Sequence, residues 1–457
     1  MALVIVGILM FAYLLIATES LTNVNKAAVA IFAGTVGWML YICYGYDFVM
    51  SLYPVEFASF LHGTTATSTA VKEFIAEYVF LKYVGRAAEI VLFLLATMTI
   101  VEILGNNGCF DFISQLLKTR RSQRMLWILS VVTFMISANL DNITTAVMML
   151  VIMRKIIPNR RHRLLYGSVI VLAANCGGSL TVIGDPNGLV LWNKGSVTAT
   201  AFSLSMLVPC LIAWLVPTWW IGRSLPEHVD TEWITMPYRG DDTRLNVWQR
   251  LLMLFVGIGG LWFIPTFHNI TKLSPFLGAL CVLAVLWIVD EIANRRVMNA
   301  DVMLLRRNPR ILQHGVIQLM LFVMGMMLAV GVVQETGAVS WLWEQISIRV
   351  SDIWILGALA GLVSTVLDNF ATALTFFTLN PSTSVNDPYW TMIAYATMAG
   401  GNVMSIGSIS GMALMRAEKM RAGWYFRHVG WMAMVGGIIG FIVLFVQQYI
   451  IQGYKGF

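Results

Sequence analysis

The chain has 457 residues, of which 58% are hydrophobic and only 12% are charged. Its mean hydropathy of +0.75 excludes an ordinary water-soluble enzyme and indicates a membrane protein with several spans. The net charge of +6 is not a nucleic-acid signature, because Lys and Arg gather in short loops between apolar runs, as on the cytoplasmic side of membranes. The sequence has no catalytic triad, phosphate-binding loop or metal-ligand cluster, so we expect neither an enzyme nor a cofactor.

Apolar runs of membrane-spanning length follow one another along the whole chain. The first run lacks the basic leader and cleavage site of a signal peptide, so we expect a tilted or partly exposed membrane helix there. We therefore expect a multi-pass integral protein of a lipid bilayer, and we assign it to the bacterial inner (plasma) membrane. The expected spans are residues 3–17, 27–44, 86–104, 164–192, 200–222, 248–265, 274–290, 314–333, 390–415 and 429–451.

A polar motif interrupts the apolar sequence twice. Residues 137–147 read SANLDNITTAV, and residues 364–374 read STVLDNFATAL. A carboxylate at the centre of a membrane segment costs roughly 2.5–3.5 kcal/mol on insertion scales, so such residues usually face a cavity, a partner or an ion pathway. Two structural Asp residues that merely cap broken helices are the alternative. The extent of the duplication favours an ion pathway, as in transporters built from internal repeats.

A second pair of segments follows the first pair in the same order and at nearly the same spacing. Residues 177–188 read GGSLTVIGDPNG, and residues 400–411 read GGNVMSIGSISG. Their glycines coincide, which together with the first pair indicates an internal repeat. Asp185 of the first copy corresponds to Ser408 of the second copy. The symmetry of the repeat is therefore broken at one carboxylate.

The charges around the first motif indicate how the chain enters the membrane. Residues 118–124 (KTRRSQR) and 154–163 (RKIIPNRRHR) are strongly basic, so both ends of the stretch 125–153 should be cytoplasmic. That stretch is too long for one ordinary span and too short for two. It fits a re-entrant helical hairpin with the Asp-Asn pair near its tip. The second hairpin, at 354–379, has few positive flanks and should enter from outside.

Each half of the chain then contains five spans and one hairpin. Because the number of spans is odd, the second half is inverted relative to the first. We predict an all-α membrane protein of two inverted repeats, residues 1–222 and 248–457, joined by a cytoplasmic linker at 223–247. Discontinuous helices and the two hairpin tips should meet near the bilayer midplane.

The hairpin tips place hard oxygen atoms beside carboxylates, which suits a Na+ ion at each tip. A carboxylate that binds either Na+ or H+, but not both, exchanges the two by competition. In the span 86–104, Glu89 is a candidate proton relay, with local pairing to Arg86 as the alternative. The candidate ion-binding and proton-exchanging residues are Asp141, Asn142, Asp185, Asp368 and Asn369, and nearby candidate ligands are Ser137, Thr144 and Asn402.

The sign of the motif charges bears on the substrate. The motif segments contain Asp141, Asp185 and Asp368 but no Lys or Arg. A dicarboxylate would face three negative charges without a basic partner, whereas a small cation would not. We therefore favour exchange of Na+ (or Li+) for H+. A Na+-coupled carrier of a dicarboxylate or of a neutral solute such as arsenite stays open as the alternative, and a membrane scaffold would have no reason to bury three acids.

The four motif segments resemble the signatures of NhaD-type Na+/H+ antiporters within the ion transporter superfamily, and the resemblance runs from TMTIVE (97–102) onward. It implies an elevator-type transporter, often dimeric, that exports Na+ or Li+ in exchange for H+, so we expect a homodimer. One departure lies at residues 186–188, where the family usually has hydroxyl residues; GDPNG resembles a segment of branches with other substrates. The functional positions implied are Asp141, Asn142, Asn175, Asp185, Ser364, Asn369, Ser405 and Ser408.

Overall fold

The computed structural model describes residues 1–22, 24–62, 65–117, 119–230, 245–294, 310–349, 352–379 and 384–455. Every regular element in these ranges is a helix, and the only β-type pairing among them is an isolated bridge between Arg121 and His228. Seven of the described helices are long and apolar enough to cross a membrane. The predicted all-α membrane class is confirmed. Most of the predicted linker, residues 231–244, lies outside the described residues.

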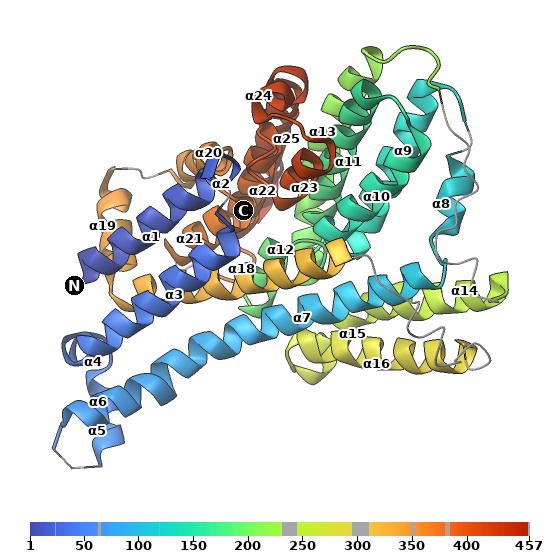
Figure 1. The fold of residues 1–457 in the computed structure, drawn as a ribbon. Helices are drawn as coiled ribbons and strands as arrows, with labels where there is room; N and C mark the ends of the chain where they lie inside the picture. The colour runs from blue at the N-terminus through green and yellow to red at the C-terminus, as the bar shows by residue number, and fades with distance from the viewer. Residues whose placement is uncertain are drawn as a thin grey trace.

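One set of helices, which we call the outer group, includes the long helices along the lower part of Figure 1. Within it α3 packs against α18, α18 against α7, and α7 against α16. The members of the outer group are α1 (Ala2–Ala17), α3 (Lys26–Cys43), α7 (Leu81–Asn106), α15 (Gly260–Thr271), α16 (Pro275–Asn294) and α18 (Arg310–Glu335).

Shorter elements extend or connect the outer helices. The span predicted at 86–104 is longer than expected, because α6 (Ser68–Phe74) and a π-helical turn (Ile75–Phe80) continue directly into α7. The other connecting elements are α2 (Glu19–Thr22), α4 (Gly45–Leu52), α5 (Pro54–Leu61), α8 (Asp111–Leu116), α14 (Val247–Leu254), the π-helical turn Phe255–Gly259 and α19 (Ala338–Arg349).

A second set, the motif group, contains both pairs of sequence motifs; its helices α9, α11, α13 and α25 stand above the outer group in Figure 1. Here α11 packs against α9 and α13, and α13 packs against α25. The members are α9 (Ser122–Asn139), α10 (Asn142–Ile156), α11 (Arg160–Gly178), α12 (Pro186–Asn193), α13 (Ala199–Arg223), α20 (Ile353–Ser364), α21 (Asn369–Leu379), α22 (Pro388–Val403), α23 (Ile409–Glu418), α24 (Ala422–Tyr425), the π-helical turn Phe426–Gly430 and α25 (Trp431–Lys455).

All four motif segments interrupt a helix. The Asp-Asn motifs separate α9 from α10 and α20 from α21, and the glycine-rich motifs separate α11 from α12 and α22 from α23. The predicted spans 164–192 and 390–415 are therefore not single helices, and neither is among the seven uninterrupted candidates. Discontinuous helices at the motifs were predicted from the sequence, and the structure places the breaks there.

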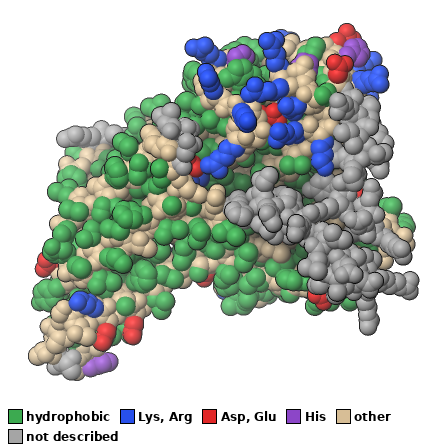
Figure 2. All heavy atoms as spheres, in the orientation of Figure 1, with side chains coloured by type: hydrophobic (Ala, Val, Ile, Leu, Met, Phe, Trp, Pro, Cys, Tyr) green, Lys and Arg blue, Asp and Glu red, His purple; other side chains and the backbone are tan. Residues whose placement is uncertain are grey.

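Lys and Arg side chains gather at the end of the molecule where α11, α23 and α24 lie, as Figure 2 shows, above a broad apolar surface. At this end Glu418, the last residue of α23, is 4% exposed and accepts two hydrogen bonds of 3.0 Å from Nε of Arg163. Arg160 donates to the carbonyl oxygens of Glu418 and Lys419, each at 3.0 Å. This Glu418 clamp ties the start of α11 to the end of α23.

Close approach between α3 and α18 depends on glycine. A Cβ atom added to Gly325 of α18 would lie 2.6 Å from the carbonyl carbon of Ala30 in α3, which is backbone and cannot rotate away. Small residues let membrane helices approach in this way.

We predict that Gly325→Ala destabilises the protein by about 1–3 kcal/mol, the usual cost of overpacking. Gly85→Ala in α7 is the matched control, since a Cβ there meets nothing within 4 Å. The measurement is the melting temperature of the detergent-solubilised protein, which should fall only for the Gly325 variant. Equal melting temperatures for both variants would contradict this account of the contact.

Candidate functional site

The first Asp-Asn motif places a carboxylate at the start of a helix. Asp141 has an extended backbone and N-caps α10, and its Oδ1 accepts hydrogen bonds from the backbone N–H groups of Ile143 (3.1 Å) and Thr144 (2.7 Å). Such N-cap bonds satisfy free helix donors and favour a negative charge. Asp141 is only 2% exposed, and its Oδ2 has no hydrogen-bond partner. One carboxylate oxygen is therefore held by the backbone, and the other is buried and unpaired.

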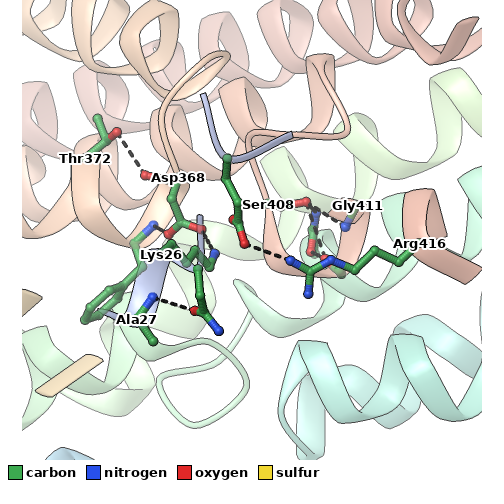
Figure 3. Close-up of polar contacts among 12 residues, drawn as sticks. Lys26, Ala27, Asp368, Thr372, Ser408, Gly411 and Arg416 are labelled. Atoms are coloured by element: carbon green, nitrogen blue, oxygen red, sulfur yellow. Dashed lines mark hydrogen bonds and ion pairs between the residues drawn. The ribbon is translucent and has the colours of Figure 1, made fainter. Parts of the chain in front are cut away.

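The second Asp-Asn motif repeats the arrangement with one difference. Oδ1 of Asp368, at the start of α21, accepts the N–H of Phe370 at 3.0 Å. Its Oδ2 lies 2.6 Å from Nζ of Lys26, the first residue of α3. Figure 3 shows these two side chains pointing toward each other. Asp368 is 2% exposed and Lys26 is 7% exposed, so the ion pair is buried.

The glycine-rich motifs also end in N-caps. Asp185 caps α12 by accepting the N–H of Asn187 at 2.8 Å, and its second oxygen accepts from Nδ2 of Asn142 at 2.8 Å. In the second half, Ser408 caps α23 by accepting the N–H of Gly411 at 3.1 Å. Both side chains cap the helix that follows them. The replacement of Asp in the first half by Ser in the second half therefore removes a charge and preserves the cap.

The same backbone contacts join the motifs in both halves. The N–H of Asn142 donates to the carbonyl of Gly184 at 3.0 Å, and the N–H of Asn369 donates to the carbonyl of Gly407 at 2.9 Å. A Cβ on either glycine would lie 2.6 Å from the carbonyl oxygen of a motif serine. Only glycine fits there, which explains why Gly184 and Gly407 recur in the repeat.

Two of the four predicted serine ligands, Ser137 and Ser364, bind the neighbouring broken helix. Ser137 donates to the carbonyl of Ala174 at 2.6 Å, and Ser364 donates to the carbonyl of Thr397 at 2.7 Å. Both hydroxyl protons are thus committed to the neighbouring broken helix. In the structure these serines fix the motif segments against α11 and α22, and neither lines the small cavity described below.

Asn175 connects the first half to the second. From α11 its Nδ2 donates to Oδ1 of Asn402 at 2.8 Å and to Oγ of Ser408 at 3.1 Å. Its Oδ1 accepts a short hydrogen bond from Ser410. Of the residues expected to act together, the structure therefore brings Asn175, Asn402 and Ser408 into one buried network.

A small cavity of about 10 Å³ lies where the motifs meet. Four predicted site residues reach it, two from each half: Asn142, Asp185, Asn369 and Ser408. Buried polar atoms without a hydrogen-bond partner gather in these segments, namely Asp141 Oδ2, Asn142 Oδ1, Thr145 Oγ1, Ser179 Oγ, both amide atoms of Asn187 and Ser405 Oγ. Unpaired buried oxygens at this density are suited to a bound ion.

Glu89 lies away from this cavity. It accepts a 2.6 Å hydrogen bond from Nδ2 of Asn193, the last residue of α12. Among the ion pairs formed by the described residues, none joins Glu89 to Arg86. Glu89 thus links α7 to α12, and its role as a proton relay stays a prediction.

Lys26 is the residue that the motif analysis missed. The motif segments themselves contain no basic residue, but the expectation that the acids have no basic partner is wrong. In the folded chain α3 supplies a lysine to one of them. The one sequence signal is a lysine directly before the apolar run 27–44, a position that ordinarily suits a lysine at the membrane surface. Nothing local in the sequence relates it to Asp368.

Comparison with known proteins identifies the chain's relatives. The citrate transporter family matches residues 13–400. Sodium/proton antiporter 1 of Arabidopsis thaliana is 30% identical over 363 residues, which are 78% of this chain and 61% of that protein. The chain thus spans less than two thirds of this plant relative, whereas its match to sodium/proton antiporter 2 of the same plant, at 29% identity, covers 84% of that protein.

Bacterial relatives confirm the resemblance to NhaD-type antiporters. The Na(+)/H(+) antiporter NhaD of Vibrio parahaemolyticus is 26% identical over 76% of this chain and 87% of its own length. That of Alkalimonas amylolytica is 24% identical over 96% of this chain and 88% of its own length. These matches, together with the apolar helices, describe a multi-pass transporter and not an enzyme. The chain belongs to the citrate transporter family.

Proposed function

We propose that the chain is a secondary active transporter that exchanges cytoplasmic Na+ (or Li+) for external H+. The observation that carries this proposal is the buried carboxylate of Asp141, one oxygen of which is held by the start of α10 while the other has no partner. Relatives that bear the name Na+/H+ antiporter support the same activity.

The chemistry follows from competition at one carboxylate. An ionised Asp141 attracts Na+, and a protonated Asp141 does not. Asp185 adds a second negative charge and orients Asn142 through their 2.8 Å hydrogen bond. No ion pair of the described residues involves Asp141 or Asp185. This part of the site is therefore suited to a cation or a proton.

The size of the cavity favours an ion over an organic anion. Its volume of about 10 Å³ is room for little more than one water molecule, whereas small-molecule pockets are usually about 300–1,000 Å³.

The second candidate is a Na+-coupled carrier of an anion or neutral solute. The family's description as citrate transporters and the GDPNG segment favour that alternative.

The proposal includes the architecture expected from the sequence. The repeats 1–222 and 248–457 are inverted, the segments at 125–153 and 354–379 are re-entrant hairpins, and the motif group moves against the outer group in an elevator-type motion. The backbone contacts shared by both halves support the repeat. We assign the protein to the bacterial inner membrane as a homodimer whose transported ions are Na+ or Li+ and H+.

The first test of this function is transport by the reconstituted protein. In proteoliposomes, an outward Na+ or Li+ gradient should acidify the lumen, and a pH-sensitive dye inside the vesicles records the change. The absence of any cation-driven pH change between about pH 6 and 9 would reject antiport. Citrate or arsenite uptake that requires Na+ would then establish the alternative.

The second test is Asp141→Asn. The amide keeps the shape of the carboxylate but cannot hold a charge, so exchange should be lost with the protein still folded. Asp352→Asn is the matched control, because Asp352 is an exposed N-cap of α20 that also accepts a backbone N–H, that of Trp354 at 2.9 Å. Wild-type exchange in the Asp141 variant would show that the competing carboxylate is elsewhere.

Competition between Na+ and H+ also determines the direction in which the apparent KM for Na+ changes with pH. A protonated carboxylate does not bind Na+, so the apparent KM for Na+ should rise as the pH falls. Below the pKa of the site the rise should approach about tenfold per pH unit for one proton. Initial rates of Na+-driven exchange at several pH values measure it. A KM that stays constant while kcat changes would indicate separate sites for the two ions.

The fourth test concerns the hairpins. Single cysteines at Arg124 and Asn159, which are exposed and flank the first hairpin, should react with an impermeant thiol reagent only from the cytoplasm. A cysteine at Val385, which is 60% exposed after the second hairpin, should react only from outside. The background must lack Cys43 and Cys281, which are exposed. Labelling of positions 124 and 159 from opposite faces would turn the first hairpin into a full span.

A further inference from the structure

The two Asp-Asn motifs have the same backbone arrangement but differ in what contacts the Oδ2 atom of the aspartate. At the first motif, Oδ2 of Asp141 is buried and unpaired. At the second motif, the equivalent Oδ2 of Asp368 is in contact with the Lys26 ammonium at 2.6 Å. A cation bound to Asp368 through this oxygen would have to stand where the ammonium stands.

The surroundings of Lys26 do not suggest an ordinary stabilising lysine. It occupies the first position of α3, where a positive charge opposes the helix dipole and is unfavourable. Its ammonium is also withdrawn from water, which is expensive unless a partner is present. The partners are Asp368 and the ring of Phe322, whose centroid is 4.5 Å from Nζ. The positive charge of Lys26 therefore disfavours helix α3, and only its contacts in the site favour it.

We propose that Lys26 is the resident cation of the second motif, tethered to the chain, so that the protein has a single exchangeable Na+ site, at Asp141. The inference rests on the proposed function in that it assumes that the motif carboxylates bind Na+. It assigns the two halves of the repeat different tasks. The first binds the transported ion, and the second is filled by the chain itself.

The ion pair also joins the two helix groups, since Lys26 belongs to the outer group and Asp368 to the motif group. Its partner Phe322 lies on α18, another outer helix. The resident cation is therefore fixed to the helices that surround the site, while the carboxylate belongs to the motif segments. A free Na+ ion at Asp368 would make no such connection.

The test counts bound ions. Radioactive Na+ is titrated into the purified full-length protein, and the number of ions per chain is measured for the wild type and for variants. The wild type should bind a single ion. Lys26→Met should gain a second ion, and Lys26→Arg, which keeps the charge, should not. The double variant Lys26→Met/Asp368→Asn, in which both charges are absent, should return to a single ion.

Asp141→Asn keeps the proposal falsifiable if Lys26→Met does not fold. With Lys26 in place, the Asp141 variant should bind no Na+, and adding Lys26→Met should restore a single ion at Asp368. The proposal would be overturned if the wild type bound two ions, or if the Asp141→Asn protein still bound one. It would also be overturned if the Lys26→Met protein gained no ion, or if no variant bound Na+.

The outcome is distinguishable from failure of the proposed function. If the ion counts follow the expected pattern but no Na+ gradient moves protons, the single-site assignment stands and antiport is rejected in favour of a Na+-coupled carrier. If exchange is observed and the wild type binds two ions, antiport stands and the role of Lys26 is rejected.

Discussion

A carboxylate buried among apolar helices loses its water, and the loss costs several kcal/mol unless other donors replace it. The site depends on the way in which this chain meets that cost. Each buried motif acid, Asp141, Asp185 and Asp368, stands at a helix break and accepts backbone N–H groups from the helix that follows. The broken helices, and the glycines that let the breaks pack together, all serve this arrangement.

The sequence allowed much of this arrangement to be predicted, because it is local. An Asp before a run of helix-forming residues and a glycine cluster inside an apolar stretch both indicate a break, and the breaks lie where the motifs are. The recurrence of the motifs predicted an internal repeat, and the contact between Asn142 and Gly184 recurs between Asn369 and Gly407. The resemblance to NhaD-type antiporters was evident from the same residues.

What the sequence could not indicate is contact between distant segments. Lys26 precedes Asp368 by most of the chain, and a lysine beside a span ordinarily lies at the membrane surface. The Asn175 network likewise depends on how α11 packs against α22 and α23. For Glu89 the sequence suggested a proton relay or a local pair with Arg86, whereas its hydrogen-bond partner is Asn193 on another helix. In each case the error or omission came from treating a side chain as if only its own helix could supply a partner.

The Glu418 clamp constrains how the two halves of the motif group can be displaced. Arg163 and Arg160, both at the start of α11, hold the Glu418 side chain and the carbonyls of Glu418 and Lys419 with five charge-assisted bonds of 3.0 to 3.3 Å. Near the centre of the molecule, Asn175 joins the same two broken helices. Two points of attachment along one pair of helices prevent them from pivoting about each other. The two broken helices are therefore joined rigidly, so that a displacement of α11 would displace α23 with it.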